Sequence, residues 1–412
     1  MNHFEYRKGA LYCEDVPLSK IAAAVGTPTY VYSRATLERH FHVLDDAFEG
    51  VPHLLCYAMK ANSNLALLRL LARWGSGFDI VSGGELLRVL SARGRADRVV
   101  FSGVGKTKDE LGFALKEGIL QFNVEGAEEL ELLDQVAREQ GRIAPFAIRV
   151  NPEIDAKTHK YIATGLKSSK FGVPFDDALA LYRRSKKLKG LLPRGLDCHI
   201  GSQLTDARPV NKAVTKVASL FEQLRAEGLA LTHLDVGGGL GITYSDERPP
   251  TVDDYARAVL KPLRGLGATL LLEPGRVLVG NAGVLLTKVL YRKRTSRRFV
   301  VVDMAMNDLI RPALYGAHHE VRPVKPRSGK REKADVVGPV CESSDILAHQ
   351  RPLAPLEQGD LLAVMSAGAY GMTMASNYNS RPRPAEVLVE GARFRVVRKR
   401  EKLDDLMRGE ST

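Results

Sequence analysis

Between residues 53 and 276, short apolar runs alternate with longer segments in which apolar residues recur every three or four positions. The short runs predict buried strands, and the longer spacing predicts amphipathic helices. Strands that alternate with helices favour a parallel sheet built from repeated βα units. Eight runs are read as strands, at residues 53–61, 77–82, 98–103, 119–125, 145–152, 195–202, 231–239 and 269–276.

Eight βα units in about 220 residues fit a (β/α)8 TIM-type barrel, and an open doubly wound sheet is the alternative. After Arg276 the pattern changes to β-branched runs interrupted by Pro and Gly, which predicts an all-β domain of the sandwich or Greek-key barrel type. Segments 4–12 and 27–33 are two further strand candidates. The predicted organisation is N-terminal strands of the β domain in residues 1–30, the barrel in 31–276 and the C-terminal β domain in 277–412.

The composition is ordinary for a globular protein, with 44% hydrophobic and 26% charged residues. A chain of 412 residues exceeds what one hydrophobic core usually serves, which agrees with two domains. No apolar stretch is long enough to span a bilayer, and the first 15 residues lack the apolar core of a signal peptide. We therefore predict a cytoplasmic protein that does not interact with membranes.

The formal net charge of +12 raises the hypothesis of a nucleic-acid partner, supported by basic runs at residues 292–298 and 325–333. Neither run is interleaved with aromatic residues that could stack on bases. A solvated loop, or a surface that attracts small anions, explains such runs better. We therefore predict no nucleic-acid partner.

The four cysteines stand without CxxC spacing, which argues against a disulfide framework and against a zinc site. Cys13, Cys56 and Cys198 are expected to be small buried side chains, since free cysteine is usually buried. Cys341 is considered separately below. No metal site is predicted.

The C-terminal ends of the predicted barrel strands carry residues that a hydrophobic core does not favour. Taken singly, each has an ordinary explanation, such as a solvated lysine or a hydrogen-bonded histidine. A parallel barrel, however, carries its chemistry on this rim, so their convergence there indicates an active site. The residues are Lys60, Asp79, Glu85, Arg149, His199, Ser202, Gly237, Gly238, Gly239, Glu273 and Arg276.

This set of side chains points to one cofactor. The glycine run 237–239 exposes backbone N–H groups, and with Arg276 in the next loop it is a credible phosphate site. Lys60 on the same rim can attack an aldehyde to form an imine. Glu273 can keep a pyridine nitrogen protonated, and His199 can stack on the ring. The combination predicts pyridoxal 5'-phosphate, with Asp79, Ser202 and Gly275 as further contacts.

Six strings resemble one known family over nearly the whole chain: YAMKAN, HIGSQ, DVGGGLG, EPGR, GPVCESSD and GAYG. The sequence is similar to the group IV pyridoxal-dependent decarboxylases, which have the alanine racemase fold. Within that group, CESSD and the segment HKYIATGLKSSKFG most resemble the enzymes that decarboxylate meso-2,6-diaminopimelate, the last step of lysine biosynthesis.

The resemblance implies roles that the residues alone leave open. Tyr370 would contact the phosphate and the substrate. Arg276, Arg311 and Tyr315 would hold the remote carboxylate of the substrate, and Glu342 its remote amine. Cys341 would donate a proton to the carbanion left after CO2 departs. It would come from the neighbouring subunit, so the resemblance implies a homodimer with shared active sites.

The chemistry of these residues supports the implied substrate. A monocarboxylic diamino acid such as ornithine spends its only carboxylate at the bond that breaks. It would leave Arg276 and Arg311 without a remote partner, which is costly for buried arginines. A substrate with two carboxylates and two amines satisfies both arginines and Glu342, and meso-2,6-diaminopimelate is such a molecule.

Alternative functions differ in substrate or in class. One is the decarboxylation of another basic amino acid or of a carboxylated polyamine, of the ornithine, arginine or carboxynorspermidine type. Another is a non-catalytic protein that binds pyridoxal phosphate. A racemase of this fold is expected to place Arg at the pyridine nitrogen, where this sequence has Glu273. The loop after the fifth predicted strand is either a lid or an ordinary basic loop; its lysines are Lys157, Lys160, Lys167 and Lys170.

Overall fold

The computed structural model describes residues 2–155 and 170–411 and divides into two compact units. Residues 41–242 and 248–277 form the barrel unit. Residues 1–40, 243–247 and 278–412 form the β unit.

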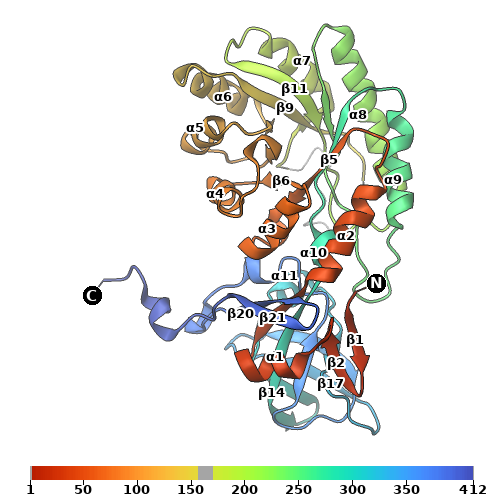
Figure 1. Ribbon diagram of the computed structural model, residues 1–412, viewed down its shortest axis with the longest axis vertical. Coiled ribbons are helices and arrows are strands. Elements are labelled where there is room, and N and C mark those ends of the chain that lie inside the picture. The colour runs from red at the N-terminus through yellow and green to blue at the C-terminus, as the bar shows by residue number, and fades with distance from the viewer. Residues whose placement is uncertain (1, 156–169, 412) are drawn as a thin grey trace. The chain divides into compact units, whose positions relative to one another are not determined.

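A closed ring of parallel strands builds the barrel unit (Figure 1). Each strand pairs in parallel with the next, and the ring closes where the last strand pairs with the first, with Leu270 opposite His53. The prediction of a (β/α)8 barrel is confirmed, and the open sheet is wrong. In order around the ring, the strands are β5 (His53–Ala58), β6 (Gly77–Ile80), β7 (Val99–Phe101), β8 (Gln121–Val124), β9 (Ala144–Asn151), β11 (Leu191–Asp197), β12 (His233–Asp235) and β13 (Thr269–Leu272).

Each of the eight predicted runs overlaps one of these strands, although β9 begins one residue and β11 four residues before the predicted run. Every residue of β6, β7 and β8 is buried, because a parallel barrel strand is covered by side chains on the inside and by helices on the outside. A short strand, β10 (Val173–Pro174), pairs with β9 outside the ring. The C-terminal ends of the eight strands therefore share one rim, as the sequence required for a single site.

Amphipathic helices follow the strands, and several of them, including those that start after Asn64 and Thr107, begin at a side chain that caps the helix. Asn64 accepts a hydrogen bond from the Ala66 N–H at 2.9 Å, and Thr107 forms a capping box with Glu110. One helix ends at Gly118, which has a left-handed φ of 71°. The helices are α2 (Arg34–Asp46), α3 (Leu65–Arg73), α4 (Gly83–Ser91), α5 (Lys108–Glu117), α6 (Ala127–Glu139), α7 (Phe175–Ser185), α8 (Arg208–Ala226), α9 (Val252–Leu260) and α10 (Arg276–Val279).

A mixed sheet forms the β unit, and it contains strands from both ends of the chain. Strand β4 pairs antiparallel with β14 and parallel with β20, so the N-terminal segment lies inside the C-terminal sheet. A short helix, α11 (Arg311–Tyr315), follows β15. The strands are β4 (Thr29–Ser33), β14 (Gly283–Arg294), β15 (Arg298–Val302), β16 (Val321–Pro323), β17 (Glu332–Val337), β18 (Ile346–Leu353), β19 (Leu361–Val364), β20 (Ala385–Glu390) and β21 (Arg393–Arg398).

The first residues form a small separate sheet of β1 (Phe4–Arg7), β2 (Ala10–Cys13) and β3 (Val16–Pro17), followed by α1 (Leu18–Val25). Segment 4–12 was expected to be one strand. It is a hairpin, because Lys8 and Gly9 have positive φ values of 49° and 75° that reverse the chain. The hairpin and α1 contribute to the buried core of the β unit, which includes Phe4, Leu11, Ile21, Val31, Leu286 and Val387.

Cys13, Cys56 and Cys198 are buried, as expected, and Cys341 is exposed. Among the helices of the described residues, none is long and apolar enough to cross a membrane.

Candidate active site

Lys60 lies at the rim of the barrel in a single 3-10 turn, Met59–Ala61, directly after β5. Its Nζ donates to Oδ2 of Asp79 on β6 at 2.7 Å. The Asp79 side chain is fully buried, whereas the Lys60 side chain is 39% exposed. The ion pair therefore fixes the position of the Lys60 amine, while part of the lysine side chain stays accessible to solvent.

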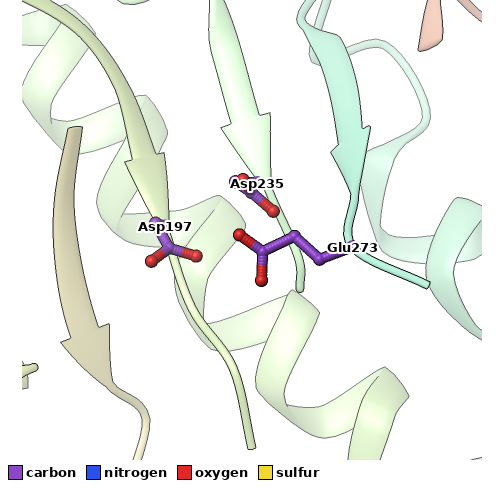
Figure 2. Close-up of side chains that lie close together, drawn as sticks. All are labelled: Asp197, Asp235 and Glu273. Carbon is purple, nitrogen blue, oxygen red and sulfur yellow. The ribbon is translucent and has the colours of Figure 1, made fainter. Parts of the chain in front are cut away.

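Glu273 follows β13, and two aspartates that the sequence analysis missed lie beside it. Figure 2 shows the carboxylates of Asp197, Asp235 and Glu273 turned toward one another. One oxygen atom from each carboxylate lies within 4.8 Å of the other two. Glu273 Oε1 accepts from Ser102 Oγ at 3.3 Å and from Asn123 Nδ2 at 3.4 Å. Asp197 and Asp235 are the last residues of β11 and β12, and that position was the signal that could have identified them.

Burial and mutual repulsion raise the pKa values of these acids. Desolvation is the largest cause for Glu273, and the negative charge of Asp235 adds to it, while the positive charges of Lys60 and Arg149 oppose the increase. The pKa of Asp197 is raised in the same way, first by burial and then by Glu273. A raised pKa means that Glu273 holds a proton more tightly than an ordinary carboxyl group, so it can share that proton with a basic nitrogen atom.

His199 lies two residues beyond β11, and its neighbours keep the ring neutral. The N–H of Gly238 donates to His199 Nδ1 at 3.2 Å, so Nδ1 is an acceptor and the ring proton belongs on Nε2. Burial lowers the pKa of His199 well below its usual value, and the positive charges of Arg149 and Lys60 lower it further. A neutral aromatic ring at this rim is suited to stacking.

The glycine run after β12 is required by close backbone packing. A Cβ atom on Gly238 would lie 2.1 Å from the carbonyl oxygen of Glu273, and Gly237 and Gly239 have positive φ values of 67° and 107°. In the next loop, Arg276 is buried, and its Nη2 donates to Ser202 Oγ at 3.2 Å. A Cβ atom on the neighbouring Gly275 would contact Ala58 at 3.2 Å.

Two other rim residues have structural partners. Arg149 on β9 is buried, and its Nη1 pairs with Glu125 at 3.4 Å. Glu85 on α4 accepts the N–H of Val81 at 2.7 Å, and burial raises its pKa to about 7. The first contact joins β9 to the residue after β8, and the second joins α4 to the residue after β6.

The remaining predicted residues belong to the β unit. Arg311 begins α11 and is buried; its Nη1 lies 2.9 Å from His319 Nε2, and Tyr315 ends the same helix. Tyr370 has a φ of 55°, which is uncommon for a residue with a side chain and often marks a functional position.

Cys341 and Glu342 are exposed on a turn that Asp345 holds in place. The buried carboxylate of Asp345 accepts from the N–H groups of Val340 at 2.8 Å and Met306 at 2.7 Å. Asp345 makes these turn contacts, and the Glu342 side chain is exposed.

Three of the lysines named for the loop after the fifth predicted strand, Lys157, Lys160 and Lys167, lie outside the described residues. The fourth, Lys170, is described, and its Nζ lies 5.1 Å from the centre of the Phe171 ring.

Known proteins resemble this chain over its whole length. Residues 34–280 match the family described as pyridoxal-dependent decarboxylase, pyridoxal binding domain. Diaminopimelate decarboxylases of Pseudomonas aeruginosa and Vibrio cholerae are each 54% identical, over all of this chain and 99% of theirs. The Helicobacter pylori diaminopimelate decarboxylase complexed with L-lysine superimposes with a TM-score of 0.93 at 46% identity, covering 95% of this chain and 98% of that one. The M. jannaschii enzyme superimposes with a TM-score of 0.95 at 37% identity, covering 100% and 98%.

Proposed function

This chain belongs to the diaminopimelate decarboxylases, a family of pyridoxal-dependent lyases, and from this premise we propose how its residues divide the work of the reaction. The reaction converts meso-2,6-diaminopimelate to L-lysine and CO2, the last step of lysine biosynthesis. Pyridoxal phosphate, when bound, supplies a conjugated ring that accepts the electron pair left as CO2 departs. The alternative substrates and the non-catalytic alternative raised by the sequence are set aside by relatives of this identity and coverage.

The donor groups on the barrel rim fit the cofactor by their chemistry. Lys60 provides the amine for the aldehyde, and Glu273 provides a carboxyl group that would keep the ring nitrogen protonated through a hydrogen bond. His199 provides a neutral ring for stacking, and Arg276 provides a guanidinium for the phosphate. The remaining proposed contacts are Asp79, Ser202, Gly237, Gly238, Gly239, Gly275 and, from the β unit, Tyr370.

One observation carries this assignment: buried Asp79 holds the Lys60 amine at 2.7 Å on the rim that also carries Glu273 and Arg276. A lysine beside a fully buried carboxylate is not an ordinary solvated charge, because its position is set by a partner inside the barrel. We expect Asp79 to orient the Lys60 amine.

The proposed substrate contacts separate the two ends of diaminopimelate. Arg276, Arg311 and Tyr315 hold the carboxylate that remains in the product, and Glu342 binds the amine at the same end. Guanidinium groups bind carboxylates through paired, charge-assisted hydrogen bonds, which suits the buried Arg276 and Arg311. Tyr370 contributes a contact to the substrate as well as to the phosphate.

Cys341 is the proposed proton donor to the carbon that loses CO2. Cys341 is exposed on the turn before Asp345, so its thiol is accessible to the active site of a second chain. We propose that the enzyme is a homodimer in which Cys341 of one subunit completes the active site of the other. The resemblance of the GPVCESSD string to the family supports this role.

The substrate assignment is tested by CO2 release from a panel of meso-diaminopimelate, LL-diaminopimelate, L-ornithine, L-arginine and carboxynorspermidine. We expect release from the meso compound with L-lysine as the product identified by mass spectrometry, and release at least about a hundredfold slower from the others, because they lack the remote carboxylate or the required stereocentre. Comparable release from ornithine or carboxynorspermidine would contradict the roles given to Arg276 and Arg311.

Replacing Glu342 with glutamine should weaken turnover of diaminopimelate. The amide oxygen of glutamine can still accept a hydrogen bond from the remote ammonium, but it lacks the negative charge of Glu342, and hydrogen bonds that involve charged groups contribute about 1.5–3 kcal/mol. We therefore expect kcat/KM to fall by roughly 10- to 150-fold in steady-state assays. Ser343→Ala, on the same exposed turn, is the control and should stay within about twofold of wild type. An unchanged kcat/KM in Glu342→Gln would assign Glu342 to the turn alone.

A further inference from the structure

A histidine that the sequence analysis did not select lies against Arg311. We propose that His319 is a positioning residue, which holds the guanidinium of Arg311 in one orientation for the remote carboxylate of the substrate. This inference rests on the proposed function of Arg311. His319 is fully buried and Arg311 nearly so, and both belong to the β unit.

The two ring nitrogens of His319 have different partners, and together these select one tautomer. Nδ1 lies 2.8 Å from the carbonyl oxygen of Met365. A carbonyl oxygen can only accept, so Nδ1 carries the proton. Nε2 then presents a lone pair, and Arg311 Nη1 donates to it at 2.9 Å. The Met365 carbonyl therefore orients the histidine, and the histidine orients the arginine.

The same guanidinium also lies over the ring of Tyr244. The central carbon of the Arg311 guanidinium lies 4.6 Å from the centre of this ring, and the Tyr244 and His319 rings meet edge to face at 5.4 Å. Arg311 is thus held by a hydrogen bond to one side chain and by a ring contact with another. Together they restrict both the direction and the rotation of the Arg311 head group.

The neutrality of His319 in this arrangement matters for binding. An aspartate or glutamate at the same position would neutralise the guanidinium and compete with a substrate carboxylate. A neutral imidazole fixes the guanidinium without adding a negative charge beside it. The contact with His319 is therefore compatible with binding of a substrate carboxylate by Arg311.

The adjacent residue His318 offers a matched control. Its Nδ1 accepts from Arg351 Nη2 at 2.7 Å, so it is also a histidine beside an arginine in the same segment. It is only partly buried, and its hydrogen-bonded arginine is Arg351 rather than Arg311. A general effect of altering this segment should appear in variants of either histidine, whereas an effect through Arg311 should appear in His319 variants.

Ligands that differ by one carboxylate provide the readout in the holoenzyme. L-lysine, the product, keeps the remote carboxylate, and 1,5-diaminopentane is the same molecule without it. We expect His319→Leu to weaken competitive inhibition by L-lysine and to raise KM for diaminopimelate, each by about tenfold, the change expected when a charged group loses a hydrogen bond. Inhibition by 1,5-diaminopentane, kcat and cofactor absorbance should change by less than about twofold.

Two further variants keep the test decisive if His319→Leu folds poorly. His319→Gln places an amide oxygen within reach of Arg311 and should restore L-lysine inhibition to within about threefold of wild type. His318→Leu should leave inhibition by both ligands unchanged. Adding His319→Leu to Arg311→Ala should cause no further loss of L-lysine inhibition, because the arginine through which His319 acts is already absent.

The outcomes separate this inference from the function on which it rests. If Arg311→Ala leaves L-lysine inhibition unchanged, the proposed role of Arg311 fails. If Arg311→Ala weakens inhibition but the His319 variants do not, the role of Arg311 stands and the positioning role of His319 is wrong. Equal losses for L-lysine and 1,5-diaminopentane in His319→Leu, or the same effect in His318→Leu, would mean that His319 only stabilises the fold.

Discussion

Replacing Lys60 with alanine is expected to remove the visible absorption of the bound cofactor and to reduce decarboxylation by about three orders of magnitude or more. Lys60 supplies the only amine proposed to bond with the aldehyde, and losing a covalent catalytic group has effects of at least this size. The absorbance spectrum of the purified protein and the rate of CO2 release measure the two effects.

Two variants control for changes in the barrel itself. Lys60→Arg keeps a positive charge beside the buried carboxylate of Asp79, but a guanidinium is a poor nucleophile, so it should be as inactive as the alanine variant while preserving the fold. Lys108→Ala removes an exposed lysine of α5 that pairs with Glu139, and it should behave as wild type. A Lys60→Ala protein that retained the absorption band would refute the assignment of the cofactor lysine.

Mixing two inactive variants should restore activity if active sites are shared between subunits. In a two-fold symmetric dimer, each chain presents the same residue to the site of the other. A mixed dimer of Lys60→Ala and Cys341→Ala chains then has one site with both changes and one site with neither. Random exchange makes about half of the dimers mixed, so activity should recover to about a quarter of the wild-type level.

The recovery is measured after the two proteins, each with a different affinity tag, have exchanged subunits. Isolation by both tags in sequence shows that mixed dimers have formed. If each chain completed its own active site, every site in a mixed dimer would carry one change, and the doubly tagged protein would stay inactive. That result would overturn both the shared site and the proposed route of Cys341 to its neighbour.

The barrel could be predicted from the sequence because its determinants are local. Each strand is a short apolar run, such as the one that forms β5, and each helix has its own apolar spacing and capping residues, such as Asn64 and Thr107. Since parallel strands in a barrel all end on one rim, polar residues that follow the runs could be assigned to a common site. Lys60 and Glu273 were found in this way, and their roles remain predictions for the experiments above.

The sequence by itself determined which segments become strands and helices and which residue types stand at the ends of the strands. Only the tertiary structure decided which side chains meet. Asp197 and Asp235 lie inside the predicted apolar runs 195–202 and 231–239, and only closure of the barrel brings their carboxylates beside Glu273. His319 is separated from Arg311 by 8 positions and from Met365 by 46, so its contacts follow no local period. Periodicity reports which face of an element is buried, whereas contacts between distant elements depend on how those elements pack.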